Sequence, residues 1–126
     1  MNIGGMRIFL SGPMTGYENH NVAAFANAHA QLKEAGAKVI YDPAIEYLMG
    51  NIRAESVASS FFMRRCVHEL TDALDVRTAS ERELTKYDML VSLPGWQDSA
   101  GATVERQVAE SCGIRCYDLD KVLGNG

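Results

Sequence analysis

The chain has 126 residues, of which 47% are hydrophobic and 22% are charged, and its formal net charge is −4. This length fits a single domain with one buried core, and the acidic balance excludes the basic surface typical of proteins that bind duplex nucleic acid. The stretch "MNIGGMRIFLSG" has one basic residue before a short apolar run, and no segment approaches the ~20 apolar residues of a membrane span. We therefore expect a cytoplasmic protein with no membrane partner.

The cysteines and histidines give no metal or disulfide pattern. Cys66, Cys112 and Cys116 are an odd number without a CxxC pair, which argues against a disulfide scaffold and a zinc ribbon. His29 and His68 lie in helical patterns without a second ligand at i+4. We expect reduced thiols and neither metal nor cofactor.

The first third of the chain predicts a strand, a helix and a second strand. Arg7–Leu10, "RIFL", is typical of a short buried strand, and the turn "SGP" ends it. Apolar residues at helical spacing begin near Asn19 and stop before Gly36, which suits the left-handed position after a helix. Lys38–Tyr41 predicts the second strand. The positions expected to face the core are Val22, Phe25, Ala26, His29 and Leu32.

Further helices and two more strands follow. Val57–Leu74 is compatible with a helix, and the capping-box letters "TASE" predict a short helix from 78 to about 86. Asp88–Leu93, "DMLVSL", is the clearest strand, and "IRCYDL" predicts the last one. Between them a helix is expected from Ala100 to Cys112. Its inward positions are expected to be Val104, Val108 and Cys112.

This order of elements predicts an α/β fold. Short apolar strands that alternate with amphipathic helices favour a parallel sheet with helices on both faces. We expect one Rossmann-like or flavodoxin-like three-layer sandwich over residues 1–126, with four or five parallel strands. Residues 1–5 are expected to be flexible and residues 120–126 to form a tail.

Two loops are expected at the edge of the sheet where ligands bind, the carboxyl ends of the strands. The Ser11–Asn21 loop has glycines but matches neither GxGxxG nor GxxxxGK[ST], so it supports neither a dinucleotide dehydrogenase nor a P-loop NTPase. Its Tyr17 and Asn21 suit either a ligand contact or a solvated loop. The second loop, Pro94–Gly101, precedes the helix that carries Glu105.

Each residue singled out in the second loop and its helix has two interpretations. Ser99 and Gly101 lie where free amides favour an anion, but Ser99 also suits a helix cap. Glu105 is either a carboxylate that complements the helix dipole or a reagent. Trp96 is either a stacking wall for a flat ligand or a lid over the edge of the core.

Two segments together resemble the nucleoside 2-deoxyribosyltransferase superfamily. They are "RIFLSGPMTGY" near the N-terminus and "YDMLVSLPGWQDSAGATVE" further along, and the middle of the chain matches poorly. The combined motif, strand-SGPMTG and a distant strand-turn-SxGxxxE, is also similar to the deoxynucleoside 5′-monophosphate N-glycosidases of that superfamily. The resemblance includes the small bacterial and phage members of the superfamily whose activity is unassigned.

The resemblance implies a nucleoside or its 5′-monophosphate as ligand and a covalent mechanism. Glu105 would attack C1′ of the sugar and expel the base, and water or a second base would then take the sugar. Asp98 is the better candidate for the acid that assists the departing base, since Asp88 begins its strand at the far end. The residues expected to bind substrate are Ser11, Gly12, Pro13, Met14, Thr15, Gly16, Tyr17, Asn21, Trp96, Ser99 and Gly101.

The chain also departs from the superfamily's pattern. Thr15 replaces an arginine that contributes to phosphate binding in the nucleotide-cleaving branch, and Ser80 replaces an aspartate of both branches. Ser99 stands where the transferases carry an aspartate that reads the base, with Asp98 one step earlier. These departures support an alternative, a non-catalytic nucleotide-binding or sensing domain. A NAD-related nucleotide hydrolase is a further alternative, and the resemblance implies a homodimer or higher homo-oligomer.

Overall fold

The strands of the protein form one parallel sheet. In the computed structural model, which describes residues 1–48, 59–72 and 86–124, four strands are ordered β2-β1-β3-β4. They are β1 (Arg7–Ser11), β2 (Val39–Tyr41), β3 (Met89–Ser92) and β4 (Arg115–Asp118). All described pairings are parallel, so the predicted parallel α/β sheet is confirmed.

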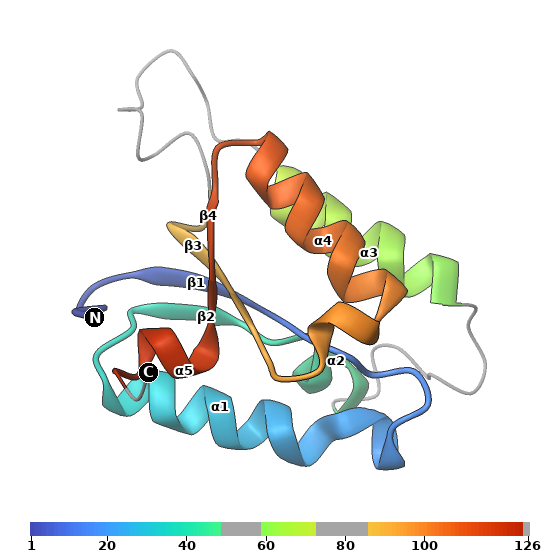
Figure 1. Cartoon of the computed structure of the whole chain (residues 1–126), viewed down its shortest axis with the longest axis horizontal. Coiled ribbons are helices and arrows are strands. Elements are labelled where there is room, and N and C mark those ends of the chain that lie inside the picture. Colours follow the sequence, from blue (N-terminus) through green and yellow to red (C-terminus); the bar gives the residue numbers. More distant parts are fainter. Residues whose placement is uncertain (49–58, 73–85, 125–126) are drawn as a thin grey trace.

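Helices cover both faces of this sheet, as expected for parallel strands joined by crossovers. Figure 1 shows α1 and α5 on one face and α3 and α4 on the other. The structure therefore has the three layers that the sequence predicts. The predicted helix at 78–86 lies outside the described residues apart from its last position. The helical elements are η1 (Glu18–Asn21), α1 (Val22–Glu34), α2 (Pro43–Leu48), α3 (Ser59–Thr71), η3 (Trp96–Asp98), α4 (Ala100–Ser111) and α5 (Leu119–Val122).

Each face of the sheet has its own apolar cluster. On the α1 and α5 side, Ile8 and Leu10 of β1 pack with Phe25 and Leu32 of α1. On the α3 and α4 side, Phe9 of the same strand packs with residues of both helices. Alternate residues of a strand face opposite sides, so both faces of β1 are buried and its sequence is a continuous apolar run.

The inward face of α4 differs from the expectation. The buried residues are Ala102, Glu105 and Ala109, whereas Val104 is 40% exposed and Cys112 is exposed. Two small alanines let the helix lie close to the sheet, and the larger apolar residues lie beside that contact. Val108 is partly buried and packs against the cluster on the α3 and α4 side, as predicted. The prediction is wrong for Val104 and Cys112, because hydropathy alone favoured the larger side chains.

The start of α1 also differs. A helix was expected from about Asn19, but Asn19, His20 and Asn21 all have left-handed backbone angles, with φ of 49°, 54° and 64°. α1 begins at Val22, and Ala28 is buried where Ala26 was expected to be. Asparagine tolerates the left-handed region better than most residues, which permits this sharp change of direction.

Both ends of the chain contribute to the core, where the sequence predicts a flexible segment and a tail. Ile3 and Val122 are each 1% exposed and belong to the cluster on the α1 side. Gly5 donates a backbone hydrogen bond to Gly36. None of the helices in the described ranges combines the length and apolar character needed to cross a membrane.

Candidate functional site

Glu105 is buried at the carboxyl end of β1. It is only 7% exposed, and its Oε1 accepts a hydrogen bond of 2.8 Å from the hydroxyl of Ser11, the last residue of that strand. The thiol of Cys66 on α3 donates a second hydrogen bond to the carboxylate. The acid therefore connects α4 with the first loop and with α3.

Burial determines the protonation of this acid. Desolvation raises the pKa of the Glu105 carboxyl from its ordinary 4.5 to about 7, while the hydrogen bonds from Ser11 and Cys66 act in the opposite direction. Near neutral pH both protonation states are therefore populated. Acids, bases and nucleophiles in active sites often have pKa values moved in this way.

Ser99 forms the N-cap of α4. Its Oγ accepts a hydrogen bond of 3.2 Å from the amide of Ala102, and its carbonyl accepts one of 2.8 Å from the hydroxyl of Thr103. The capping role considered for Ser99 is thus present. Its own hydroxyl proton is still able to donate, and the first amides of a helix have no partner within the helix. The cap is therefore compatible with an anion at the same place.

Gly101 has a packing role in α4. A Cβ at this position would lie 3.3 Å from Cε of Met63 on α3. The missing side chain lets the two helices approach closely, and this approach holds α3, with Cys66, against the helix that carries Glu105. Gly101 is therefore part of the support of the carboxylate as well as a candidate for anion binding.

The two loops at the carboxyl edge lie against each other. The amide of Leu93 donates to the carbonyl of Ser11 at 2.8 Å. A Cβ on Gly12 would lie 2.7 Å from Cβ of Leu93, so only glycine permits this approach. A Cβ on Gly95 would likewise lie 2.7 Å from the hydroxyl oxygen of Tyr17. The loop after β1 and the turn after β3 thus form one continuous rim.

The remaining residues of the first loop form a folded turn. Asn21 donates from its side-chain amide to the carbonyl of Pro13 at 2.9 Å, which closes the loop. Met14 packs against the cluster on the α1 side, whereas Thr15 and Gly16 are exposed at the tip. Pro13 is buried. The first loop therefore contributes mainly its backbone and its exposed tip to the surface of the rim.

Trp96 lies beside Arg106 and Asp118. Its Nε1 donates to Oδ1 of Asp118 at 3.0 Å, and the guanidinium of Arg106 lies 4.3 Å from the centre of its ring. Arg106 also donates to the same Oδ1 at 3.0 Å and to the hydroxyl of Ser92 at 3.1 Å. One face and the N–H group of the indole are thus engaged by protein groups.

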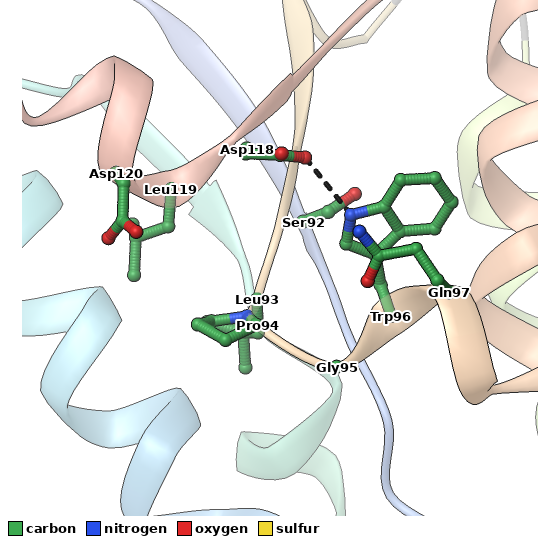
Figure 2. A pocket seen from close by; sticks show the side chains of 9 residues that line it. All are labelled: Ser92, Leu93, Pro94, Gly95, Trp96, Gln97, Asp118, Leu119 and Asp120. Carbon is green, nitrogen blue, oxygen red and sulfur yellow. Dashed lines mark hydrogen bonds between the residues drawn. The ribbon is translucent and has the colours of Figure 1, made fainter. Parts of the chain in front are cut away.

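A cavity of about 250 Å³ adjoins this cluster. Figure 2 shows Trp96 and Gln97 on one side of it and Leu119 and Asp120 on the other, with Pro94 between them. Glu105 does not line this cavity. The structure therefore separates the predicted site residues into a group around Glu105 and Ser11 and a group around Trp96.

The two aspartates considered as acids lie in different places. Asp98 is exposed in η3, outside the hydrogen bonds described for Glu105. Asp88 accepts hydrogen bonds of 2.9 Å from the amide and the guanidinium of Arg7. Because Arg7 begins β1, Asp88 lies at the amino end of the sheet, away from the rim as expected.

Four residues of the site were missed in the sequence. Cys66, Ser92, Arg106 and Asp118 contact the candidate residues, but each lies within a regular helix or strand, where no local motif marks it. One signal was present: Ser11 and Ser92 both end apolar strands, and they are paired in register. Attention to polar residues at equivalent strand ends would have added Ser92 to the predicted rim.

Fold and site together define a class: an α/β protein with a buried carboxylate at the carboxyl edge of a parallel sheet. Residues 6–118 match the family described as a domain of unknown function, DUF4406. The match covers most of the chain, so the protein belongs to this family. No curated protein matches the chain.

Proposed function

We propose that the protein cleaves or transfers the N-glycosidic bond of a nucleoside, a deoxynucleoside or a 5′-monophosphate of either. The observation that carries the proposal is the buried carboxylate of Glu105, held by the hydroxyl of Ser11 at the start of the "SGPMTG" loop. The two residues belong to the two segments that resemble the deoxyribosyltransferase superfamily. Their direct contact supports a common role.

Glu105 is the nucleophile in this proposal. Its ionised carboxylate attacks C1′ of the sugar, the C1′–N bond breaks, and its electron pair leaves with the base. A proton donated to the base makes it a better leaving group. Attack of water or of an acceptor base on C1′ then releases the sugar and restores the carboxylate.

Other residues of the rim have supporting roles. Asp98 is the proposed proton donor, because it lies in the turn that directly precedes the helix of Glu105. The hydroxyl of Ser99 and the first amides of α4 are the proposed contacts of a 5′-phosphate, because a helix N-terminus favours an anion. Assembly into a homo-oligomer that completes the site is part of the same proposal.

A panel of substrates tests the activity. The protein is incubated with ribo- and deoxyribonucleosides, their 5′-monophosphates and NAD, with and without an acceptor base, and released base is measured by chromatography. Free base without an acceptor indicates a hydrolase, and exchange that requires the acceptor indicates a transferase. Base release restricted to NAD would favour a NAD-related nucleotide hydrolase.

The nucleophile is tested by substitution. Glu105→Gln and Glu105→Ala are each expected to reduce turnover on the order of 10³-fold or more, because neither side chain forms the glycosyl ester. Glu34→Gln is the control, since this carboxylate is exposed on α1. Activity retained in Glu105→Gln would refute the assignment.

One observation favours a second candidate. Glu105 is 7% exposed and is already bonded to two protein groups, which suits a domain that binds a nucleotide without reacting with it. Binding detected by calorimetry, with no base released from any member of the panel, would identify such a sensing domain.

A further inference from the structure

Two consecutive residues of α4 contact two serines that are paired in the sheet. Glu105 accepts from the hydroxyl of Ser11, and Arg106 donates to the hydroxyl of Ser92. Ser11 ends β1 and Ser92 ends β3, and the two residues are partners in the register of these strands. Neighbouring strands lie about 4.8 Å apart, so the two contacts fix α4 at two separate points.

Arg106 is held from several directions. Besides Ser92, its guanidinium contacts Asp118 at 3.0 Å, Glu110 at 3.7 Å and the ring of Trp96. Its side chain is 19% exposed, in contrast to 60% for Glu110 and 56% for Asp118. A planar guanidinium with five donors suits this combination of bonding and stacking better than an ammonium group does.

These contacts join four parts of the rim. Trp96 belongs to the turn after β3, Asp118 ends β4, Ser92 ends β3, and Arg106 belongs to the helix that carries Glu105. Arg106 therefore connects α4 to the turn and to the ends of β3 and β4, which the sheet already pairs at Ser92 and Asp118. Residues adjacent in a helix point about 100° apart, so Arg106 faces β4 while Glu105 faces β1.

We propose that Arg106 is a positioning residue whose contacts with Ser92, Asp118 and Trp96 hold α4 in the rotation that directs Glu105 toward Ser11. Arg106 does not contact the reacting atoms in this role. It acts through the helix, and Trp96 serves as its stacking surface. The catalytic part of this inference rests on the proposed function, whereas the positional part does not.

The experiment uses Arg106→Met and Arg106→Lys in the full chain. Methionine keeps an apolar stem without donors or charge, and lysine keeps the charge without the planar fork. Two readouts need no substrate. Trp96 is the single tryptophan of the chain, so intrinsic fluorescence reports its environment directly. Carbon NMR of the labelled glutamate side chains gives the pKa of Glu105, with Glu105→Gln identifying its signal.

The proposal makes a directional prediction. In Arg106→Met the fluorescence of Trp96 shifts to longer wavelength, and the pKa of Glu105 falls by about one pH unit or more as water reaches the misplaced carboxylate. Loss of the Arg106 charge without movement of the helix would instead leave that pKa unchanged, because burial and the hydrogen bonds from Ser11 and Cys66 determine it. A raised or unchanged pKa in a folded Arg106→Met variant overturns the proposal.

Activity and controls complete the test. If the protein is a glycosidase or transferase, Arg106→Met lowers kcat on the order of 10²-fold with a smaller change in KM, because the nucleophile is misplaced rather than the ligand lost. Arg106→Lys is expected to hold α4 partly in place. Its fluorescence, pKa and kcat are therefore expected to lie between those of the wild type and Arg106→Met. Arg64→Met, at an exposed arginine of α3, is expected to change none of them. Absence of activity in the wild type would refute the proposed function while leaving the fluorescence and pKa results decisive for Arg106.

Discussion

Burying Glu105 lowers the stability of the folded protein at neutral pH. Its described partners, the hydroxyl of Ser11 and the thiol of Cys66, are both neutral donors. Such donors only partly replace the water that an ionised carboxylate loses on burial. The protein keeps an acid at the rim at the expense of stability, a pattern common at functional sites.

Glu105→Gln is therefore expected to remove a pH-dependent loss of stability. Below about pH 4 the wild-type carboxyl is protonated in both states. As pH rises from 4.5 to about 7 the unfolded state loses this proton first, so the folded state loses about 3 kcal/mol of stability relative to Glu105→Gln. Urea unfolding of both proteins between pH 4 and pH 8 measures the difference. Glu34→Gln, at an exposed position of α1, is expected to show no such trend. A constant offset between wild type and Glu105→Gln would contradict the burial argument.

The same pKa predicts the pH dependence of the proposed reaction. The nucleophile must be ionised, so kcat/KM is expected to rise with pH through a midpoint of about 7. Ser11→Ala removes a donor that favours the carboxylate, and its midpoint is expected at higher pH. Initial rates across pH 5 to about 9 measure both profiles. Ser111→Ala, whose hydroxyl bonds within α4, serves as the control. A profile that falls with rising pH would indicate that Glu105 acts as an acid.

At the scale of elements, the rim depends on close contacts between backbones. Gly12 lets the loop after β1 lie against Leu93, and Gly101 lets α3 lie against α4. These glycines differ in what surrounds the missing side chain. A Cβ added at Gly12 would contact the Cβ of Leu93, which is fixed to the backbone. A Cβ added at Gly101 would contact Cε of Met63, which is the flexible end of that side chain.

Substitution by alanine should separate these two cases. Gly12→Ala is expected to lower the free energy of unfolding by about 1–3 kcal/mol, because its Cβ would lie 2.7 Å from that of Leu93 and must displace the strand end. Gly101→Ala is expected to change stability by less than about 1 kcal/mol, since Met63 is able to move and alanine favours the helix. Denaturant unfolding compares the two variants. If both variants lost the same free energy of unfolding, the distance from the added Cβ to its neighbour would not determine the effect of the substitution.

At the scale of the whole molecule, residues near both termini complete the cluster on the α1 side. Ile3 precedes the first strand and Val122 lies in α5, yet both are buried with the central strands. The segments that contain Ile3 and Val122 are therefore part of the folded unit. Their removal should affect the sheet and not only a peripheral segment.

Ile3→Ala tests this arrangement. The substitution is expected to lower the free energy of unfolding by about 2–4 kcal/mol, because it leaves a cavity in a closely packed cluster. Met1→Ala is the control, since Met1 is 49% exposed. Thermal or urea unfolding measures both. A loss below about 0.5 kcal/mol in Ile3→Ala would mean that the N-terminal segment does not pack on the core.

The order of elements was largely readable from the sequence. The ends of β1, β2, β3 and β4 were predicted within one residue, since short apolar runs between turn residues are a local signal. The cap at Ser99 was also among the expected roles. On the inward face of α4 only Val108 was predicted correctly, because burial of alanine and glutamate depends on what packs against them.

The sequence by itself determined the parallel α/β architecture and the two loops at its carboxyl edge. Hydrophobic periodicity and turn residues are properties of neighbouring positions, so they can be recognised in the amino-acid sequence. Only the tertiary structure decided that Glu105 is buried against Ser11, 94 residues away, and that Arg106 joins Trp96 to Asp118. Desolvation and hydrogen bonding across such separations depend on how strands and helices pack, and that packing is set by the whole chain at once.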